Sequence, residues 1–148
     1  MLGLFKKRAP VYPTESHWSV GRGMHDGMPI FVRRNTSAAS LAGHPDYRFR
    51  VGVAIPLKSP KADGLPGNDE MNELNAIEDA LCARLEVNRE SLHVLSITTQ
   101  GMREFIFYTR SPAEVEPALE ALRSEVAGHE LQSYVAEDPK WGVYAHFA

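Results

Sequence analysis

The sequence of 148 residues contains a single cysteine, Cys82. One cysteine excludes an intramolecular disulfide and a cysteine-rich zinc site, and it is compatible with a reducing compartment. The chain also lacks any apolar run near the roughly 20 residues that a membrane-spanning helix needs. Its first ten residues place the basic side chains after the apolar ones, the reverse of a secretory signal. We therefore expect a cytoplasmic protein with no membrane span.

An excess of positive charge is absent as well. The 16 Lys and Arg residues are outnumbered by 19 Asp and Glu residues, for a formal net charge of −3. Nucleic-acid-binding domains normally carry a basic footprint, so this balance argues against a nucleic-acid partner. The charges are segregated, however, with acids gathered over residues 63–90 and arginines over residues 22–50. This segregation fits a solvated helix face, or a surface that docks another protein or a second copy in a homodimer.

Sequence motifs of the common enzyme classes are missing too. The chain has no nucleophile elbow, phosphate-binding loop, dinucleotide fingerprint or HExxH motif. None of the six histidines has a helical partner four residues away, and Cys82 borders the apolar stripe of a predicted helix, as a buried thiol would. His93 is expected to be buried on the strand face that it shares with Leu95 and Ile97. We predict no catalytic residue, no cofactor and no metal site.

Strand alternation and helical periodicity are plentiful in the rest of the sequence. Residues 1–15 form a predicted flexible arm that includes a basic cluster (Lys6, Lys7, Arg8), and residues 16–148 form a single α+β domain. A hairpin that turns at Asp26-Gly27 comes first, followed by a loop over residues 35–45. The remaining elements are predicted as strands over 46–56, 92–99, 103–109 and 130–136, and as helices over about 68–85 and 111–128.

The order of these elements after the hairpin is β-α-β-β-α-β, the split βαβ pattern of ferredoxin-like domains. We therefore predict an antiparallel sheet with two helices on one face, extended by the N-terminal hairpin. The strands over 92–99 and 103–109 carry apolar residues on both faces, so both faces of the sheet should be covered. The hairpin, the C-terminal segment around Trp141 or a partner subunit could cover the second face, and we favour cover from within the chain.

RNA-recognition domains share this order of elements and carry aromatic residues on their third strand. Here the corresponding segment begins Gly101-Met102-Arg103-Glu104, so an arginine stands where a stacking aromatic is expected. Glu104 would in addition repel phosphate. The segment argues against RNA binding.

Four segments of the chain together resemble a bacterial family that is known as domain of unknown function number 695. The segments are Trp18 with Asp26-Gly27-Met28-Pro29, Asp63-Gly64-Leu65-Pro66, residues 101–108, and Asp138-Pro139-Lys140-Trp141-Gly142-Val143-Tyr144. The resemblance covers residues 16–146 and implies no catalytic residues. It also implies a distant association with the protein regulator of ribonuclease E, a ferredoxin-like inhibitor that binds its target enzyme.

Six conspicuous residues lie near the hairpin, the third core strand and the tail, and they could converge on one polar-aromatic binding patch: Trp18, Glu104, Tyr108, Asp138, Trp141 and Tyr144. The alternative is a structural lock, in which buried aromatic residues hold the hairpin and the tail on the sheet. We predict a non-enzymatic protein-binding or regulatory module. The alternative function is a small-ligand-binding protein or a hydrolase with a pocket near Glu104 and Asp138, assisted by His93.

Overall fold

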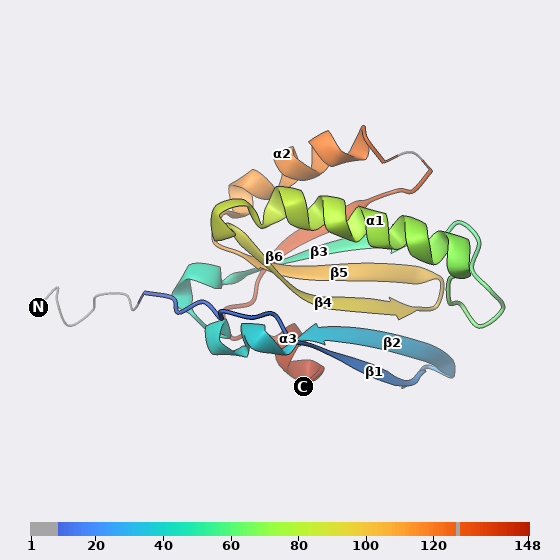
Figure 1. Cartoon of the computed structure of the whole chain (residues 1–148), viewed down its shortest axis with the longest axis horizontal. Coiled ribbons are helices and arrows are strands. Elements are labelled where there is room, and N and C mark those ends of the chain that lie inside the picture. Colours follow the sequence, from blue (N-terminus) through green and yellow to red (C-terminus); the bar gives the residue numbers. More distant parts are fainter. Residues whose placement is uncertain (1–8, 127) are drawn as a thin grey trace, which may run out of the picture.

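The computed structural model describes residues 9–126 and 128–148, so the basic cluster Lys6, Lys7 and Arg8 lies outside the described residues. The chain folds into an α+β structure with one six-stranded antiparallel sheet, as the sequence predicts (Figure 1). The strand order is β1-β2-β4-β5-β3-β6. Within the described part of the chain, no helix is long and apolar enough to cross a membrane.

The first two strands, β1 (Trp18–His25) and β2 (Met28–Asn35), form a hairpin. Asp26 and Gly27 make its turn with φ angles of 51° and 78°, a conformation that the Asp-Gly pair adopts readily. Strand β2 then pairs with β4, so β1 forms one edge of the sheet.

The remaining elements follow the predicted order, with differences at their ends. They are β3 (Phe49–Pro56), α1 (Asn68–Leu85), β4 (Ser91–Thr99), β5 (Met102–Thr109), α2 (Pro112–Arg123), β6 (Gln132–Glu137) and α3 (Gly142–His146). The second helix ends at Arg123 rather than at Gly128, because the N–H groups of Glu125 and Val126 both bond to the carbonyl of Leu122 and close the last turn. The predicted loop over 35–45 contains a short 3₁₀ helix, Thr36–Leu41.

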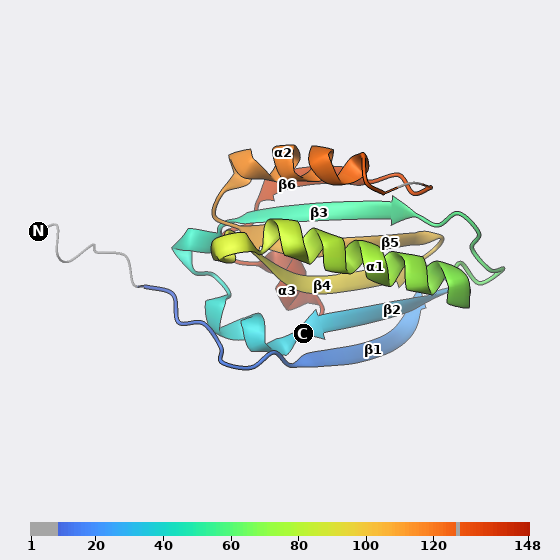
Figure 2. The same cartoon turned by 45° about the horizontal axis from the view of Figure 1, so that its top comes forward.

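Helices α1 and α2 lie on one face of the sheet, which we call the helix face (Figures 1 and 2). The core between the helices and this face is apolar, and helical spacing aligns its α1 residues. Helical spacing in the sequence also predicts that Met71 belongs to this apolar stripe of α1, but Met71 is 37% exposed. The buried core residues are Val51, Val53, Ile55, Leu57, Leu74, Ile77, Leu81, Leu85, Phe105, Phe107, Val115, Leu119, Leu122 and Leu131.

The opposite face, which we call the outer face, is covered from within the chain, as favoured from the sequence. Helix α3 and the segment over residues 36–47 supply the cover, and the hairpin instead lengthens the sheet at its edge. The second core consists of Ala38, Leu41, Tyr47, Val94, Leu95, Ile106, Tyr108, Trp141 and Tyr144.

A β-bulge in strand β4 changes the face of one predicted residue. His93 pairs with Phe107 and Leu95 pairs with Ile106, so Val94 is the extra residue of the bulge. The bulge reverses the alternation, and His93 therefore faces the helices while Leu95 faces outward. His93 is buried at 3% exposure as predicted, but the face that it was expected to share with Leu95 is wrong.

Candidate functional site

Four of the six predicted site residues meet on the outer face and form a lock. Trp141 stacks on Tyr108 with 4.1 Å between ring centroids and a 6° interplanar angle, and Tyr144 meets the edge of Trp141. The Trp141 indole N–H donates to the carbonyl of Tyr47 at 2.7 Å. The Tyr144 hydroxyl donates to the carbonyl of Asn35 at 2.6 Å, at the end of β2. These contacts join the tail to the sheet and the hairpin.

Asp138 is the polar centre of this lock. Its carboxylate accepts hydrogen bonds from the Tyr108 hydroxyl at 2.7 Å, from Arg50 Nη1 at 2.9 Å and from the Gly142 N–H at 2.8 Å. Although burial opposes ionisation, these donors lower the pKa of Asp138. Both carboxylate oxygens are occupied within the protein, so this arrangement serves to hold the tail.

The other two predicted site residues lie elsewhere. Trp18 is on the helix face, with its ring centroid 4.9 Å from that of His93 and the Arg33 guanidinium 5.0 Å from its ring. Glu104 is half-buried on the outer face opposite Ala54, and no hydrogen bond or ion pair joins it to another described residue. Because His93 and Asp138 lie on opposite faces, the acid–base group of Glu104, Asp138 and His93 expected for a hydrolase does not assemble.

A cysteine–histidine pair lies beneath Trp18. Cys82 Sγ is 3.5 Å from His93 Nδ1, and His93 Nε2 is 3.1 Å from the carbonyl of Leu95, which can only accept. Burial raises the pKa of the Cys82 thiol and lowers the pKa of His93 to about 4. Both groups are therefore neutral near pH 7, whereas a cysteine nucleophile requires a thiolate.

Glu70, Glu73 and His129 form a cluster with suitable ligand atoms for a metal ion. The Glu70 carboxylate already accepts from the N–H groups of Lys58 and Ser59, at 2.6 and 3.0 Å, and from His129 at 2.8 Å. The Lys58 ammonium is 3.0 Å from a Glu73 oxygen and supplies the cation that the acids require. The cluster thus anchors the segment after α2 to the start of α1.

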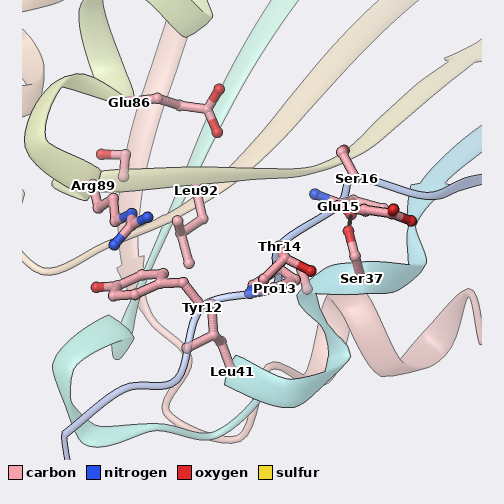
Figure 3. A pocket seen from close by; sticks show the side chains of 13 residues that line it. Tyr12, Pro13, Thr14, Glu15, Ser16, Ser37, Leu41, Glu86, Arg89 and Leu92 are labelled. Atoms are coloured by element: carbon pink, nitrogen blue, oxygen red, sulfur yellow. Dashed lines mark hydrogen bonds between the residues drawn. The ribbon is translucent and has the colours of Figure 1, made fainter.

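A cavity of about 300 Å³ lies between the N-terminal segment, the 3₁₀ helix and the junction of α1 with β4 (Figure 3). The Tyr12 hydroxyl is 2.5 Å from that of Tyr47, and the Arg89 guanidinium is 4.0 Å from the centroid of the Tyr12 ring. Its charged lining residues, Glu15, Glu86 and Arg89, are all exposed. Burial raises the pKa of Glu86, and its carboxylate already accepts from the His93 N–H at 3.1 Å. The charged groups of this cavity therefore have water or protein partners, and nothing in it requires a ligand.

The largest cavity that we describe measures about 640 Å³ and lies beside α1 on the helix face, between that helix and strands β2, β4 and β5. We call it the Arg103 cavity. Helix α1 lines it with residues spaced three or four apart, so that they share one side of the helix. The lining residues are Phe31, Arg33, Lys61, Leu65, Pro66, Asn68, Met71, Asn75, Glu78, Asp79, Thr98 and Arg103.

Arg103 is the unusual member of this lining, because it is a cation with only 6% of its surface exposed. Its Nε donates to Thr98 Oγ1 at 2.8 Å, but its other contacts are a 3.5 Å bond to Asn75 Oδ1 and a 3.2 Å contact with Met71 Sδ, a weak acceptor. No carboxylate among residues 9–126 and 128–148 lies within ion-pair distance of Arg103. Glu78, whose charge acts on Arg103 from farther away, forms its ion pair with Arg33 at 2.7 Å. Burial consequently lowers the pKa of Arg103.

A tightly held loop forms one wall of the Arg103 cavity. The Gly64 carbonyl accepts from the Gly101 N–H at 2.9 Å, and the Lys61 N–H donates to the Leu65 carbonyl at 2.9 Å. Gly64 has a φ of +82°, and a Cβ placed on it would be 3.0 Å from the backbone Cα of Gln100. Only glycine fits this close approach to the β4–β5 turn.

Replacing Gly64 with alanine is expected to lower the free energy of unfolding by about 1–2 kcal/mol, because a left-handed residue with a Cβ is strained. The clash with Gln100 should also displace the wall that holds Leu65 and Pro66. The control is Gly67→Ala, where φ is −75° and an added Cβ meets nothing within 4 Å. Urea unfolding of both variants checks this, and equal losses would contradict it.

Arg103 is not among the site residues predicted from the sequence, although its position in the strand pattern is unusual. Strand alternation places Arg103 on the same face as Phe105 and Phe107, so a charged residue stands on a strand face that is otherwise apolar. Comparison with RNA-recognition domains marks the same arginine only as the residue that replaces a stacking aromatic.

Comparison with known proteins agrees with the resemblance described above. Residues 16–148 match the model of a family described as "Family of unknown function (DUF695)". No curated protein and no solved structure matches the chain. The matched range contains the hairpin, the sheet, all of the helices that line either core, and the Arg103 cavity.

Proposed function

The chain belongs to the DUF695 family, whose function is unknown, and from its geometry we propose that it is a non-enzymatic binding module for a small organic anion. The site is the Arg103 cavity. One observation carries the proposal: the Arg103 guanidinium is almost fully buried, borders a cavity of about 640 Å³, and has no carboxylate within ion-pair distance in the part of the chain that the structure describes.

This observation points to a ligand because burying an unpaired charge is unfavourable for the folded protein. A buried charge is unfavourable unless another charge compensates it, and buried arginines are normally paired. Arg103 uses one of its five donors well and two weakly, so its fork can still hold an anion in two-point geometry. The volume is within the range of ordinary small-molecule sites. The neutral state of Cys82 and His93 supports binding rather than catalysis.

We also propose that the fold is ferredoxin-like, and the order of the strands in the sheet supports this assignment. Without the hairpin, the strands lie in the order β4-β5-β3-β6, with both crossover helices on one face, which is the arrangement of ferredoxin-like domains. A cytoplasmic location, a bacterial origin, a link to the regulator of ribonuclease E and a role in protein binding or homodimer formation stay predictions. The exposed edge strand β1 is where a protein partner could pair.

Replacing Arg103 with methionine tests the proposed function. We expect the free energy of unfolding to be unchanged or higher by about 1 kcal/mol, because an unpaired buried charge is replaced by an apolar chain of similar length. We also expect small organic anions such as hexanoate and benzoate to raise the Tm of the wild type and not that of Arg103→Met. Thermal unfolding monitored by circular dichroism measures both effects.

The matched control is Arg110→Met, which removes an exposed arginine away from the cavity and should keep the anion-induced shift. Arg103→Lys keeps the charge but not the fork and should show a reduced shift. If no organic or inorganic anion raises the wild-type Tm, or if Arg103→Met responds as the wild type does, the proposed function is wrong.

A further inference from the structure

The lining of the Arg103 cavity narrows the chemistry of the anion. We infer that the ligand is a monocarboxylic acid with an apolar body, an inference that rests on the proposed function. Three features carry it, namely the charge of the lining, the geometry of the guanidinium and the apolar walls.

The charge of the lining favours a single negative charge. Arg33, Lys61 and Arg103 contribute three cations, and Glu78 and Asp79 contribute two carboxylates. One negative charge therefore neutralises the cavity. A phosphate monoester carries close to two charges at pH 7, and its second charge would meet the carboxylates on α1 without a free buried cation to balance it.

The position of Arg103 favours a planar head group. The guanidinium is on the floor formed by the sheet, between Thr98 on β4 and Asn75 on α1, so a ligand must insert its charged end toward the strands. A carboxylate presents two coplanar oxygens to a guanidinium fork. The 3.5 Å bond to Asn75 is long enough to exchange for a shorter one to the ligand.

Apolar side chains form the walls around this head-group position. Phe31 from β2 lies on one side, and Leu65, Pro66 and Met71 lie toward the start of α1. Met71 is 37% exposed and Phe31 is half-buried, so a ligand body would remove apolar surface from water at both. An anion without an apolar body, such as acetate, would leave the side chains of these walls in contact with water.

Isothermal titration of the full chain with a matched series tests the inference. The series consists of acetate, hexanoate, hexyl phosphate and hexanol. We expect hexanoate to bind at least about tenfold more tightly than acetate, because several methylene groups are buried. It should exceed hexyl phosphate by a similar factor, and hexanol should bind more weakly than hexanoate because it lacks the charge.

Phe31→Ala distinguishes the binding contribution of the ligand's apolar body from that of its carboxylate. We expect it to weaken hexanoate binding severalfold and to leave acetate binding unchanged, and Phe49→Ala, which lies outside the cavity lining, is the control. Tighter binding of hexyl phosphate, or equal binding of acetate and hexanoate, would overturn the inferred class and leave the anion site intact. If none of the three anions binds, the proposed function itself is wrong.

Discussion

Alanine in place of Trp141 is expected to lower the free energy of unfolding by about 3–5 kcal/mol, the range for deleting a buried large aromatic side chain. Trp141 is completely buried, and its ring stacks on Tyr108 and meets Tyr144. The substitution also leaves the Tyr47 carbonyl without the indole donor that it now has at 2.7 Å. Urea unfolding followed by far-ultraviolet circular dichroism measures the loss without relying on tryptophan fluorescence.

The other tryptophan of the chain is the matched control. Trp18 is half-buried at the edge of the helix face, and its N–H donates to the hydroxyl of Ser16, two residues away, at 3.1 Å. We expect Trp18→Ala to cost about 1–2 kcal/mol, because less apolar area is lost. If Trp141→Ala costs no more than Trp18→Ala, the lock between the tail and the sheet does not stabilise the protein as we describe.

Acid should destabilise the protein through His93. Its pKa is about 4 in the folded protein, because burial disfavours the imidazolium, against about 6.5 in the unfolded chain. Between these values the unfolded chain binds a proton that the folded protein does not, so stability falls as the pH falls. We expect a loss of about 2–3 kcal/mol from pH 7 to pH 4.5, with no contribution from this group above pH 7.

His93→Gln removes this group and should reduce the loss of stability over this window, while Glu86 and Glu104, whose pKa values burial raises, still contribute with the opposite sign. His146→Gln, at an exposed position in α3, should leave the dependence as it is in the wild type. The window ends at pH 4.5 because Glu70 and Asp138, whose pKa values are lowered in the folded protein, lose their contributions at lower pH. An unchanged slope in His93→Gln would contradict the assignment to His93.

Local sequence patterns specify much of the fold. The Asp-Gly turn, the alternation of β3 and β5, and the apolar spacing of α1 each specify an element from a few neighbouring residues. The bulge at Val94 could not be predicted, because an extra residue in one strand is defined only by its pairing with another. It moved His93 to the helix face. The cover of the outer face by residues 36–47 likewise depends on long-range packing.

The candidate site was harder to predict for the same reason. Large aromatic residues are conspicuous in the local sequence, and four of the six predicted site residues do meet. Their polar groups, however, already have partners within the protein: Tyr108 donates to Asp138, and Trp141 and Tyr144 donate to backbone carbonyls. A ligand site needs a group whose partners are missing, and missing partners are a property of the three-dimensional arrangement. Arg103 is adjacent to the predicted Glu104, yet strand alternation places the two side chains on opposite faces.

Nuclear magnetic resonance of the Arg103 Nε–H group during titration with hexanoate tests most directly whether Arg103 receives the charged end of a ligand. Arg103 Nε donates to Thr98 Oγ1 at 2.8 Å in a buried position, so its proton should exchange slowly enough to be seen. The signal is assigned by its absence in Arg103→Lys. We predict a saturable shift of the Arg103 signal, while the signal of Arg123, whose Nε–H donates to the Leu131 carbonyl at 3.1 Å outside the cavity, stays unmoved. A hexanoate titration that saturates elsewhere in the spectrum, or nowhere, while the Arg103 signal stays in place would contradict the account.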